Sequence, residues 1–299
     1  MAITERRALA ILKQQLAASG ATPRWLALGI GDDCAILRGP LQSAVWTTDA
    51  CAEGSHFLWE WMAPEDIAHK AWHAALSDVA AMGGAPRGVN VHLTLTERVG
   101  DAFLRRFAAE QARLVQSTRA VVTGGNITFG SHFSVVTSVL GDVRGAALRR
   151  GTARAGDELW LCGEVGLARA GLLLLQRGQR GRPSPAEQHC LQAFRRPVAQ
   201  LKRGPQLLGR ARACLDVSDG LARDVQNLAK ASGVHIAVDR EELRRTLHAD
   251  LVQVADELGE DPLDLAWTGG EDYALLSTGP AAKRPKWVNV IGQVHKRAR

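Results

Sequence analysis

The chain has 299 residues, of which 46% are hydrophobic and 23% are charged, a balance typical of soluble globular proteins. Its length allows two domains with sizeable cores. No stretch approaches 18 apolar residues, and the first residues lack the apolar segment of a signal peptide. The five cysteines have no C-x-x-C spacing, which argues against a cysteine zinc site and against a disulfide framework. We therefore expect a cytoplasmic protein without membrane partners.

The net charge is +6, which raises the question of nucleic-acid binding. The basic residues are mostly dispersed, and no DNA- or RNA-reading motif occurs. The basic segment 295–299 is interpreted as a solvated tail. We expect no nucleic-acid partner, and the excess positive charge favours anionic, phosphorylated substrates.

The first half of the chain alternates predicted helices and strands. Apolar positions at helical spacing predict a helix over 5–17. A strand over 44–48 is expected to end at Asp49, and a helix to begin at 64–66 and end at Gly83-Gly84. Strands are predicted at 89–96, 120–123 and 132–140, with a helix over 102–116.

The sequence pattern changes near residue 150. Strands are predicted at 158–162, up to Leu215-Asp216, at 234–238 and twice near the end, with helical segments at 172–175 and 220–231 and a polar loop at 176–184. The pattern predicts an α/β (α+β) fold with two domains, 1–148 and 149–299, and a boundary within 145–152.

Acidic residues recur at the ends of short apolar runs, in the segments Gly31–Asp33, Thr47–Asp49, Leu76–Asp78 and Asp216–Asp219. A carboxylate beside apolar sequence is costly unless it is paired or binds a metal. Carboxylates together with hydroxyls are the oxygen ligands that Mg²⁺ takes. Although single clusters are also typical of turns, the four together indicate a metal-dependent phosphoryl-transfer enzyme.

Two of these clusters have an informative local setting. Asp78 falls on the same helical face as Ala75 and Met82, so it is expected to point inward. Asp216–Asp219 lies where a strand gives way to a helix, whose N-terminus attracts phosphate; a simple N-cap is the alternative. No G-x-x-x-x-G-K-[ST], kinase-type glycine loop or G-x-S-x-G motif is present.

These motifs resemble those of the thiamine-monophosphate kinase family. The resemblance rests on Gly29–Asp33, Thr47–Asp49, Glu53–Leu58, Leu76–Gly83, Gly124–Thr128, Asp216–Leu221, Ala231–Val234 and Gly269–Tyr273. The wider superfamily includes aminoimidazole-ribonucleotide synthetase, selenophosphate synthetase and a hydrogenase maturation factor. The resemblance implies two α/β domains, N-terminal domains that pair in a homodimer with a shared β-barrel, and direct transfer of the γ-phosphoryl group of ATP to thiamine monophosphate.

The resemblance also implies roles for single residues. The implied Mg²⁺ ligands are Asp33, Thr47, Thr48, Asp49, Asp78, Asn126, Asp216 and Asp219. The implied ATP contacts are Thr47, Gly125, Asn126, Arg150 and Ser218, and the implied contacts to the thiamine phosphate are His56 and Glu271. No proton-transfer residue is expected, because a phosphate acceptor is already an anionic nucleophile.

The sequence departs from the family pattern in two places. Asn126 stands where the family has an acid, and the chain ends soon after Val290–Val294, where family members continue. The second domain is therefore expected to be truncated relative to the family. Two alternatives stay open: a divergent paralogue that acts on another small molecule, and a nucleotide-binding protein with reduced or no turnover.

Overall fold

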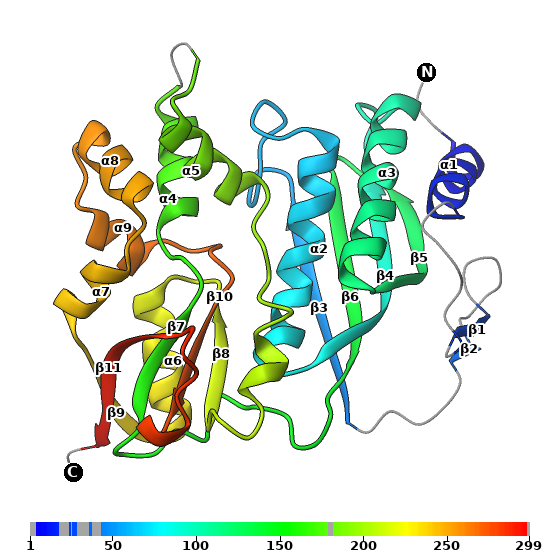
Figure 1. Ribbon diagram of the computed structural model, residues 1–299. Coiled ribbons are helices and arrows are strands. Elements are labelled where there is room, and N and C mark those ends of the chain that lie inside the picture. The colour runs from blue at the N-terminus through cyan, green and yellow to red at the C-terminus, as the bar shows by residue number, and fades with distance from the viewer. Residues whose placement is uncertain are drawn as a thin grey trace. The chain divides into compact units, whose positions relative to one another are not determined.

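A computed structural model describes residues 4–17, 24, 26–28, 36–37, 43–178 and 182–297 of the chain (Figure 1). The predicted metal ligand Asp33 lies outside these described residues. The chain divides into two compact units. The N-terminal unit consists of residues 1–79 and 85–143, and the C-terminal unit consists of residues 80–84 and 144–299. Each unit has its own mixture of helices and strands, as expected for an α/β protein.

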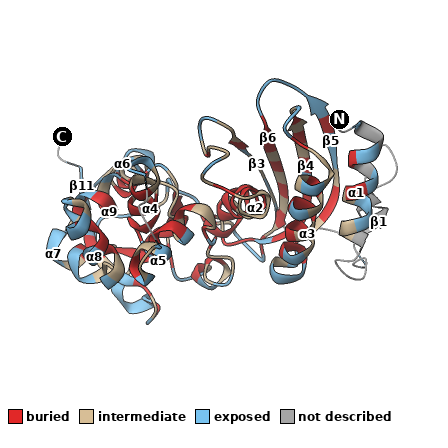
Figure 2. Cartoon of the chain, turned by 90° about the horizontal axis from the view of Figure 1, so that it is seen from above, coloured by how far each residue is buried: buried red, intermediate tan, exposed pale blue. Residues whose placement is uncertain are grey.

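The N-terminal unit contains a mixed sheet with the strand order β3-β6-β4-β5. Its elements are α1 (Glu5–Ala17), β1 (Leu26–Leu28), β2 (Ile36–Leu37), β3 (Ala44–Ala52), α2 (Pro64–Ala81, which ends in the other unit), β4 (Ala85–Leu95), α3 (Asp101–Thr118), β5 (Val121–Phe129) and β6 (Ser134–Asp142). β4 and β5 are parallel and are joined through α3, whereas β6 is antiparallel to both of its neighbours. Helices α2 and α3 cover one face of this sheet (Figure 2).

Side-chain alternation explains why that face is covered. Along β6 every second residue is buried, as expected for a strand with one face against a core. α2 packs closely there: a Cβ on Gly141 of β6 would lie 2.6 Å from a methyl of Val79. A larger residue at position 141 would push the helix away from the sheet.

The C-terminal unit contains an antiparallel sheet with the order β8-β10-β7-β11-β9. Its elements are β7 (Glu158–Cys162), α4 (Leu167–Gln176), α5 (Pro185–Arg195), the 3-10 turn η1 (Gly204–Leu207), β8 (Ala213–Val217), α6 (Leu221–Ser232), β9 (Val234–Val238), α7 (Arg240–Thr246), α8 (Ala249–Leu258), α9 (Pro262–Thr268), β10 (Ala274–Gly279), η2 (Ala281–Lys283) and β11 (Asn289–Lys296).

Both faces of this second sheet are buried along β8, β10 and β7. Along β7, Leu159 and Leu161 belong to the core shared with α6, whereas Trp160 and Cys162 face a separate core that includes Leu207. A third apolar cluster holds α4, α5, α8 and α9 together. Strands buried on both faces read as apolar runs; β7 does so from Leu159 to Cys162, and β8 does so except at Asp216.

The structure confirms the predicted helix over 5–17 and the strands at 158–162 and 234–238. The predicted ends of two strands are wrong. β3 runs past Asp49 to Ala52, and β5 continues through Gly124 and Asn126 to Phe129, so these residues lie within strands rather than in loops. Among the described helices, none is long and apolar enough to span a membrane.

Candidate active site

Two predicted metal ligands of the N-terminal unit meet between β3 and α2. The hydroxyl of Thr47 donates to a carboxylate oxygen of Asp78 at 2.5 Å. Thr47 and Asp49 are two residues apart on β3 and therefore share a face of the sheet. Asp78 lies half-buried on α2, pointing inward as its helical position predicts. The hydroxyl and carboxylate oxygens of these residues are the kind of ligand that a hard cation takes.

The side chain of Thr48 does not lie with Thr47, Asp49 and Asp78. Thr48 lies between Thr47 and Asp49 and so points to the opposite face, where its hydroxyl bonds to Ser138 of β6 at 2.8 Å. Its predicted role as a metal ligand stays a prediction.

Gly125 and Asn126 lie on β5, at the opposite edge of the sheet from β3. Gly125 pairs with Val91 of β4, and a Cβ there would lie 1.9 Å from the carbonyl oxygen of Val91. Asn126 pairs with His92 and is exposed. Since β6 and β4 separate the two edges, the sheet does not place Asn126 beside Thr47 and Asp49.

In the C-terminal unit, the Asp216–Asp219 segment and the Gly269–Tyr273 segment pack against each other. The backbone N–H of Glu271 donates to the carbonyl of Ser218 at 2.9 Å, and that of Tyr273 donates to Val217 at 2.8 Å. A Cβ on Gly270 would lie 2.6 Å from the carbonyl oxygen of Ser218. Glycine is therefore required at position 270 for the two segments to touch, and the contact brings Ser218 and Glu271 together.

The Gly269–Tyr273 segment also has an unusual backbone. Glu271 and Tyr273 have positive φ angles of 64° and 52°, a conformation that non-glycine residues rarely adopt. Such residues are found where the surrounding structure enforces them, and they cluster at ligand sites. The fold thus holds Glu271, a predicted substrate contact, in a strained conformation.

The two remaining predicted contacts have other partners within their own units. His56 follows β3, and its Nδ1 accepts from the backbone N–H of Ala52 at 3.1 Å. The carbonyl of Arg150 accepts from the hydroxyl of Ser232, the last residue of α6, whereas Ser218 precedes the first turn of that helix. Twelve helical residues, about 18 Å, separate those two ends, so within this unit the backbone of Arg150 is not beside Ser218.

Comparison with known proteins places these motifs in a family. Residues 31–143 match the family described as AIR synthase related protein, N-terminal domain. A thiamine-monophosphate kinase of Aquifex aeolicus is 33% identical over 269 residues, which covers 89% of this chain and 86% of that protein. The chain belongs to the thiamine-monophosphate kinase family.

Solved structures agree with this family membership. The crystal structure of a thiamine-monophosphate kinase from Stenotrophomonas maltophilia K279a has 30% identity and a TM-score of 0.87, and the match covers 96% of this chain and 94% of that one. A structure of AaThiL complexed with AMPPCP and TMP has 31% identity and a TM-score of 0.82, covering 98% of this chain and 91% of that one.

In this member of the thiamine-monophosphate kinase family, Asp272 holds the start of a helix, a role the sequence reasoning missed. Both carboxylate oxygens of Asp272 accept from the backbone N–H of Gly166, at 3.0 and 3.1 Å, where α4 begins. Burial raises the pKa of Asp272 to about 7, although the N–H groups of Gly166 and Ala168 act in the opposite direction. The Gly269–Tyr273 segment is thereby tied to α4 as well as to β8.

Asp224 supports the other predicted segment and was also missed. It lies buried in the first turn of α6, and its carboxylate accepts from the backbone N–H of Asp219 at 3.2 Å. Burial raises the pKa of Asp224 to about 6. Its position, three residues after Leu221 on the apolar face of that helix, is a signal that could have identified it.

Proposed function

We propose that this chain transfers the γ-phosphoryl group of ATP to the phosphate of thiamine monophosphate, forming thiamine diphosphate. The observation that carries this proposal is the match, along nearly the whole chain, to thiamine-monophosphate kinases, including the structure complexed with AMPPCP and TMP. The contact between the Asp216–Asp219 and Gly269–Tyr273 segments supports it, because it joins predicted metal, ATP and substrate contacts in one unit.

We further propose that the predicted ligands bind Mg²⁺. The donor chemistry fits, because Thr47, Asp49 and Asp78 offer only oxygen atoms and two of these side chains are already in contact. When bound, Mg²⁺ neutralises charge on the transferred phosphoryl group. We assign Asp33, Thr48, Asn126, Asp216 and Asp219 to the same task as proposals.

The protein's own groups would position two phosphates and balance their charge. Ser218 lies just before the N-terminus of α6, where free backbone N–H groups favour phosphate. Asp224 would keep this turn in place through the N–H of Asp219. Arg150, whose backbone lies at the other end of α6, stays a predicted ATP contact. Because the acceptor is an anionic phosphate, no side chain needs to remove a proton.

One assay, applied to the unaltered chain and to variants, tests this function. The protein is incubated with Mg²⁺-ATP and thiamine monophosphate, and thiamine diphosphate is quantified by chromatography. We expect product, and we expect Asp216→Asn or Asp78→Asn to lower kcat/KM at least about 100-fold. Asp101→Asn, which alters an exposed ion pair with Arg7, is the matched control and should keep full activity. Absence of product from the unaltered chain would refute the proposal.

Thermal-shift measurements separate the alternatives. A divergent paralogue would be stabilised by an ATP analogue but not by thiamine monophosphate. A nucleotide-binding protein without turnover would be stabilised by nucleotide yet form no product. In that case Asn126→Asp, which restores a carboxylate on β5, is expected to recover turnover if the missing charge is the cause.

We also propose that the N-terminal domain pairs in a homodimer. Trp46 on β3 and Phe129 on β5 are large apolar side chains on the two edge strands of the sheet, and they are 78% and 55% exposed. Aromatic side chains are enriched at protein interfaces. Trp46→Glu is expected to shift the protein from dimer to monomer in light scattering coupled to gel filtration. Val198→Glu, at an exposed apolar residue of the C-terminal unit, is the control. The shared barrel, the roles of the two domains and the cytoplasmic location stay predictions.

A further inference from the structure

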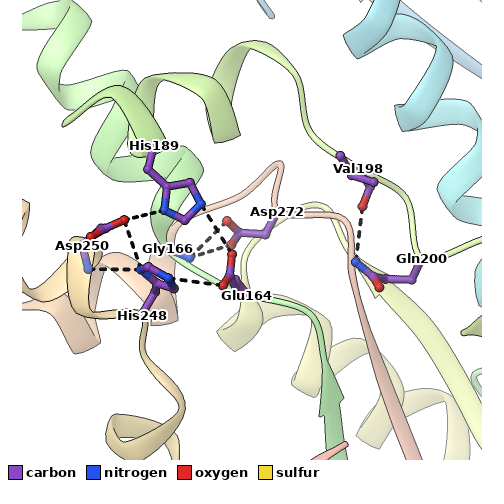
Figure 3. Close-up of polar contacts among 8 residues, drawn as sticks. All are labelled: Glu164, Gly166, His189, Val198, Gln200, His248, Asp250 and Asp272. Atoms are coloured by element: carbon purple, nitrogen blue, oxygen red, sulfur yellow. Dashed lines mark hydrogen bonds and ion pairs between the residues drawn. The ribbon is translucent and has the colours of Figure 1, made fainter. Parts of the chain in front are cut away.

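Two histidines and two carboxylates gather in the C-terminal unit, outside the predicted active-site residues. His189 comes from α5, His248 and Asp250 from the start of α8, and Glu164 from the segment after β7 (Figure 3). Their side chains are between 33% and 51% exposed, so an ion in solution can reach them. Three segments distant in sequence thus supply one polar cluster.

Each imidazole ring lies between the two carboxylates. The Nδ1 of His189 is 2.7 Å from Asp250 Oδ2, and its Nε2 is 3.9 Å from a Glu164 oxygen. His248 repeats this arrangement, with its Nδ1 3.4 Å from Asp250 Oδ2 and its Nε2 3.9 Å from the other Glu164 oxygen. The ring centroids are 4.7 Å apart, and the rings stand nearly perpendicular.

We propose that this cluster binds a divalent transition-metal ion of the Zn²⁺ type. The ligands are Nε2 of His189, Nε2 of His248 and the carboxylate of Glu164, and water completes the shell. Two ligands of a tetrahedral ion are about 3.3 Å apart when each lies about 2.0 Å from it. Each Nε2 lies 3.9 Å from one of the two Glu164 oxygens, so each of these pairs would shorten by about 0.6 Å with both carboxylate oxygens turned toward the ion.

Asp250 is assigned the role of orienting the rings. The distance from Asp250 Oδ2 to Nδ1 of His189 is 2.7 Å, which is that of a hydrogen bond. Two ligand atoms of one tetrahedral ion would lie farther apart than this, so Asp250 is not assigned as a ligand. A metal-bound histidine usually donates its other ring N–H to a carboxylate, which fixes the ring and its tautomer. His189 already has that arrangement, with Nδ1 donating to Asp250 and Nε2 facing Glu164.

His248 must change tautomer to bind the ion. Its Nδ1 accepts from the backbone N–H of Asp250 at 3.1 Å and caps α8, so the proton of the neutral ring is on Nε2. Metal binding moves that proton to Nδ1, which then donates to the Asp250 carboxylate. The ring keeps one proton throughout, and the helix cap is exchanged for a bond to the orienting carboxylate.

The ligand types separate this site from the proposed Mg²⁺ site. Imidazole nitrogen suits Zn²⁺, Cu²⁺ and Ni²⁺, whereas Mg²⁺ prefers oxygen ligands. The cluster also has a structural consequence. Glu164 lies two residues before Gly166, whose N–H is held by Asp272, so a bound ion would fasten α5 and α8 to the segment that leads into α4.

The test uses the full chain, stripped of metal and without nucleotide. Zn²⁺ is titrated by calorimetry in excess Mg²⁺, and Co²⁺ is added in a parallel sample to read ligand type from its absorption. We expect one tight Zn²⁺ per chain and an intense cobalt spectrum without a thiolate charge-transfer band. Competition by Mg²⁺, or a thiolate band, would overturn the proposal.

Variants assign the ion to these residues. His189→Gln combined with His248→Asn should abolish tight binding, and asparagine keeps a side-chain oxygen to cap α8. Asp250→Asn should weaken binding about 10–100-fold, as loss of an orienting carboxylate does. His235→Gln, at an exposed histidine on β9, is the control and should bind as the unaltered chain does. Equal Zn²⁺ affinity in the double variant and the control would refute the site.

Discussion

Gly125 offers the sharpest test of how β5 is positioned. A Cβ at this residue would lie 1.9 Å from the carbonyl oxygen of Val91 and 2.8 Å from its carbonyl carbon. Ordinary contact begins at 3.4 Å, so the substitution Gly125→Ala forces the two backbones apart by about 1.5 Å. The clash is with the backbone of β4 and cannot be relieved by turning a side chain.

The cost follows from the strand pairing. Gly125 and Val91 are register partners, so a displacement of this size disrupts the neighbouring ladder hydrogen bonds. Losing about two such bonds costs about 1–3 kcal/mol, and overpacking adds about 1–3 kcal/mol. We expect a total loss of about 2–6 kcal/mol, a large part of the 5–15 kcal/mol that stabilises a typical domain.

Urea unfolding and amide hydrogen exchange would measure this loss. Exchange in peptides that cover β4 and β5 reports the N-terminal unit separately. Gly124→Ala is the matched control, because its Cβ would meet only the Asn90 side chain, at 3.2 Å, and should cost less than about 1 kcal/mol. We also expect Gly125→Ala to weaken ATP binding at least about 10-fold. Equal stability of the two alanine variants would refute the reasoning.

Three further predictions follow from single contacts. Thr47→Val removes the hydroxyl that bonds to Asp78 and should cost about 1–2 kcal/mol in metal-free urea unfolding, whereas Thr47→Ser should cost little; equal losses would contradict the bond. Arg212→Met leaves the fully buried Asp157 without its cation and should cost about 2–4 kcal/mol, so an unchanged Tm would contradict it. Burial raises the pKa of Asp272 to about 7 from 3.8, so the folded chain holds a proton that the unfolded chain releases. The stability that the buried Asp272 carboxyl contributes is therefore greatest below about pH 4 and is lost as the pH rises through about 7, and Asp272→Asn should remove this part of the pH dependence of unfolding.

The sequence predicted secondary structure well where one periodicity dominates. The helix over 5–17 and the strands β7 and β9 have such patterns. The two errors in strand ends have the same kind of cause, because residue types that are common in loops lie within strands here. These are the acid Asp49 in β3 and the paired glycines Gly124 and Gly125 in β5. In the structure, Asp49 points toward α2 from within β3, and Gly125 lies where β4 comes too close for a side chain.

Helices α7, α8 and α9 were not predicted, although their signals are present. Asp239 and Asp261 cap α7 and α9, and Gly259 ends α8 in the left-handed conformation. These helices are short, between seven and ten residues, so each offers only about two or three turns in which an apolar periodicity could be recognised, and α7 consists mostly of charged residues. Cap residues alone would have located them.

The candidate site was predictable as a set of motifs but not as contacts. Sequence spacing placed Asp78 inward, and the structure agrees. The pairing of Glu271 with Ser218 joins residues 53 positions apart and depends on how β10 enters the sheet. His189 and His248 lie in unrelated segments with no motif around them, so only the packing of α5 on α8 shows them as neighbours.

The strand order of the second sheet has a consequence for synthesis of the protein. β10 and β11 lie on either side of β7, yet they follow β7, β8 and β9 in the chain and leave the ribosome after them. Until residues 274–296 emerge, β8, β7 and β9 have no neighbours in that sheet, whereas every strand of β3-β6-β4-β5 is already made. Domains that fold as units do so in order of synthesis, and unpaired strand edges are prone to aggregate. The sheet of the C-terminal unit therefore depends on residues 274–296, and a translation product that stops before them would expose those edges to other chains.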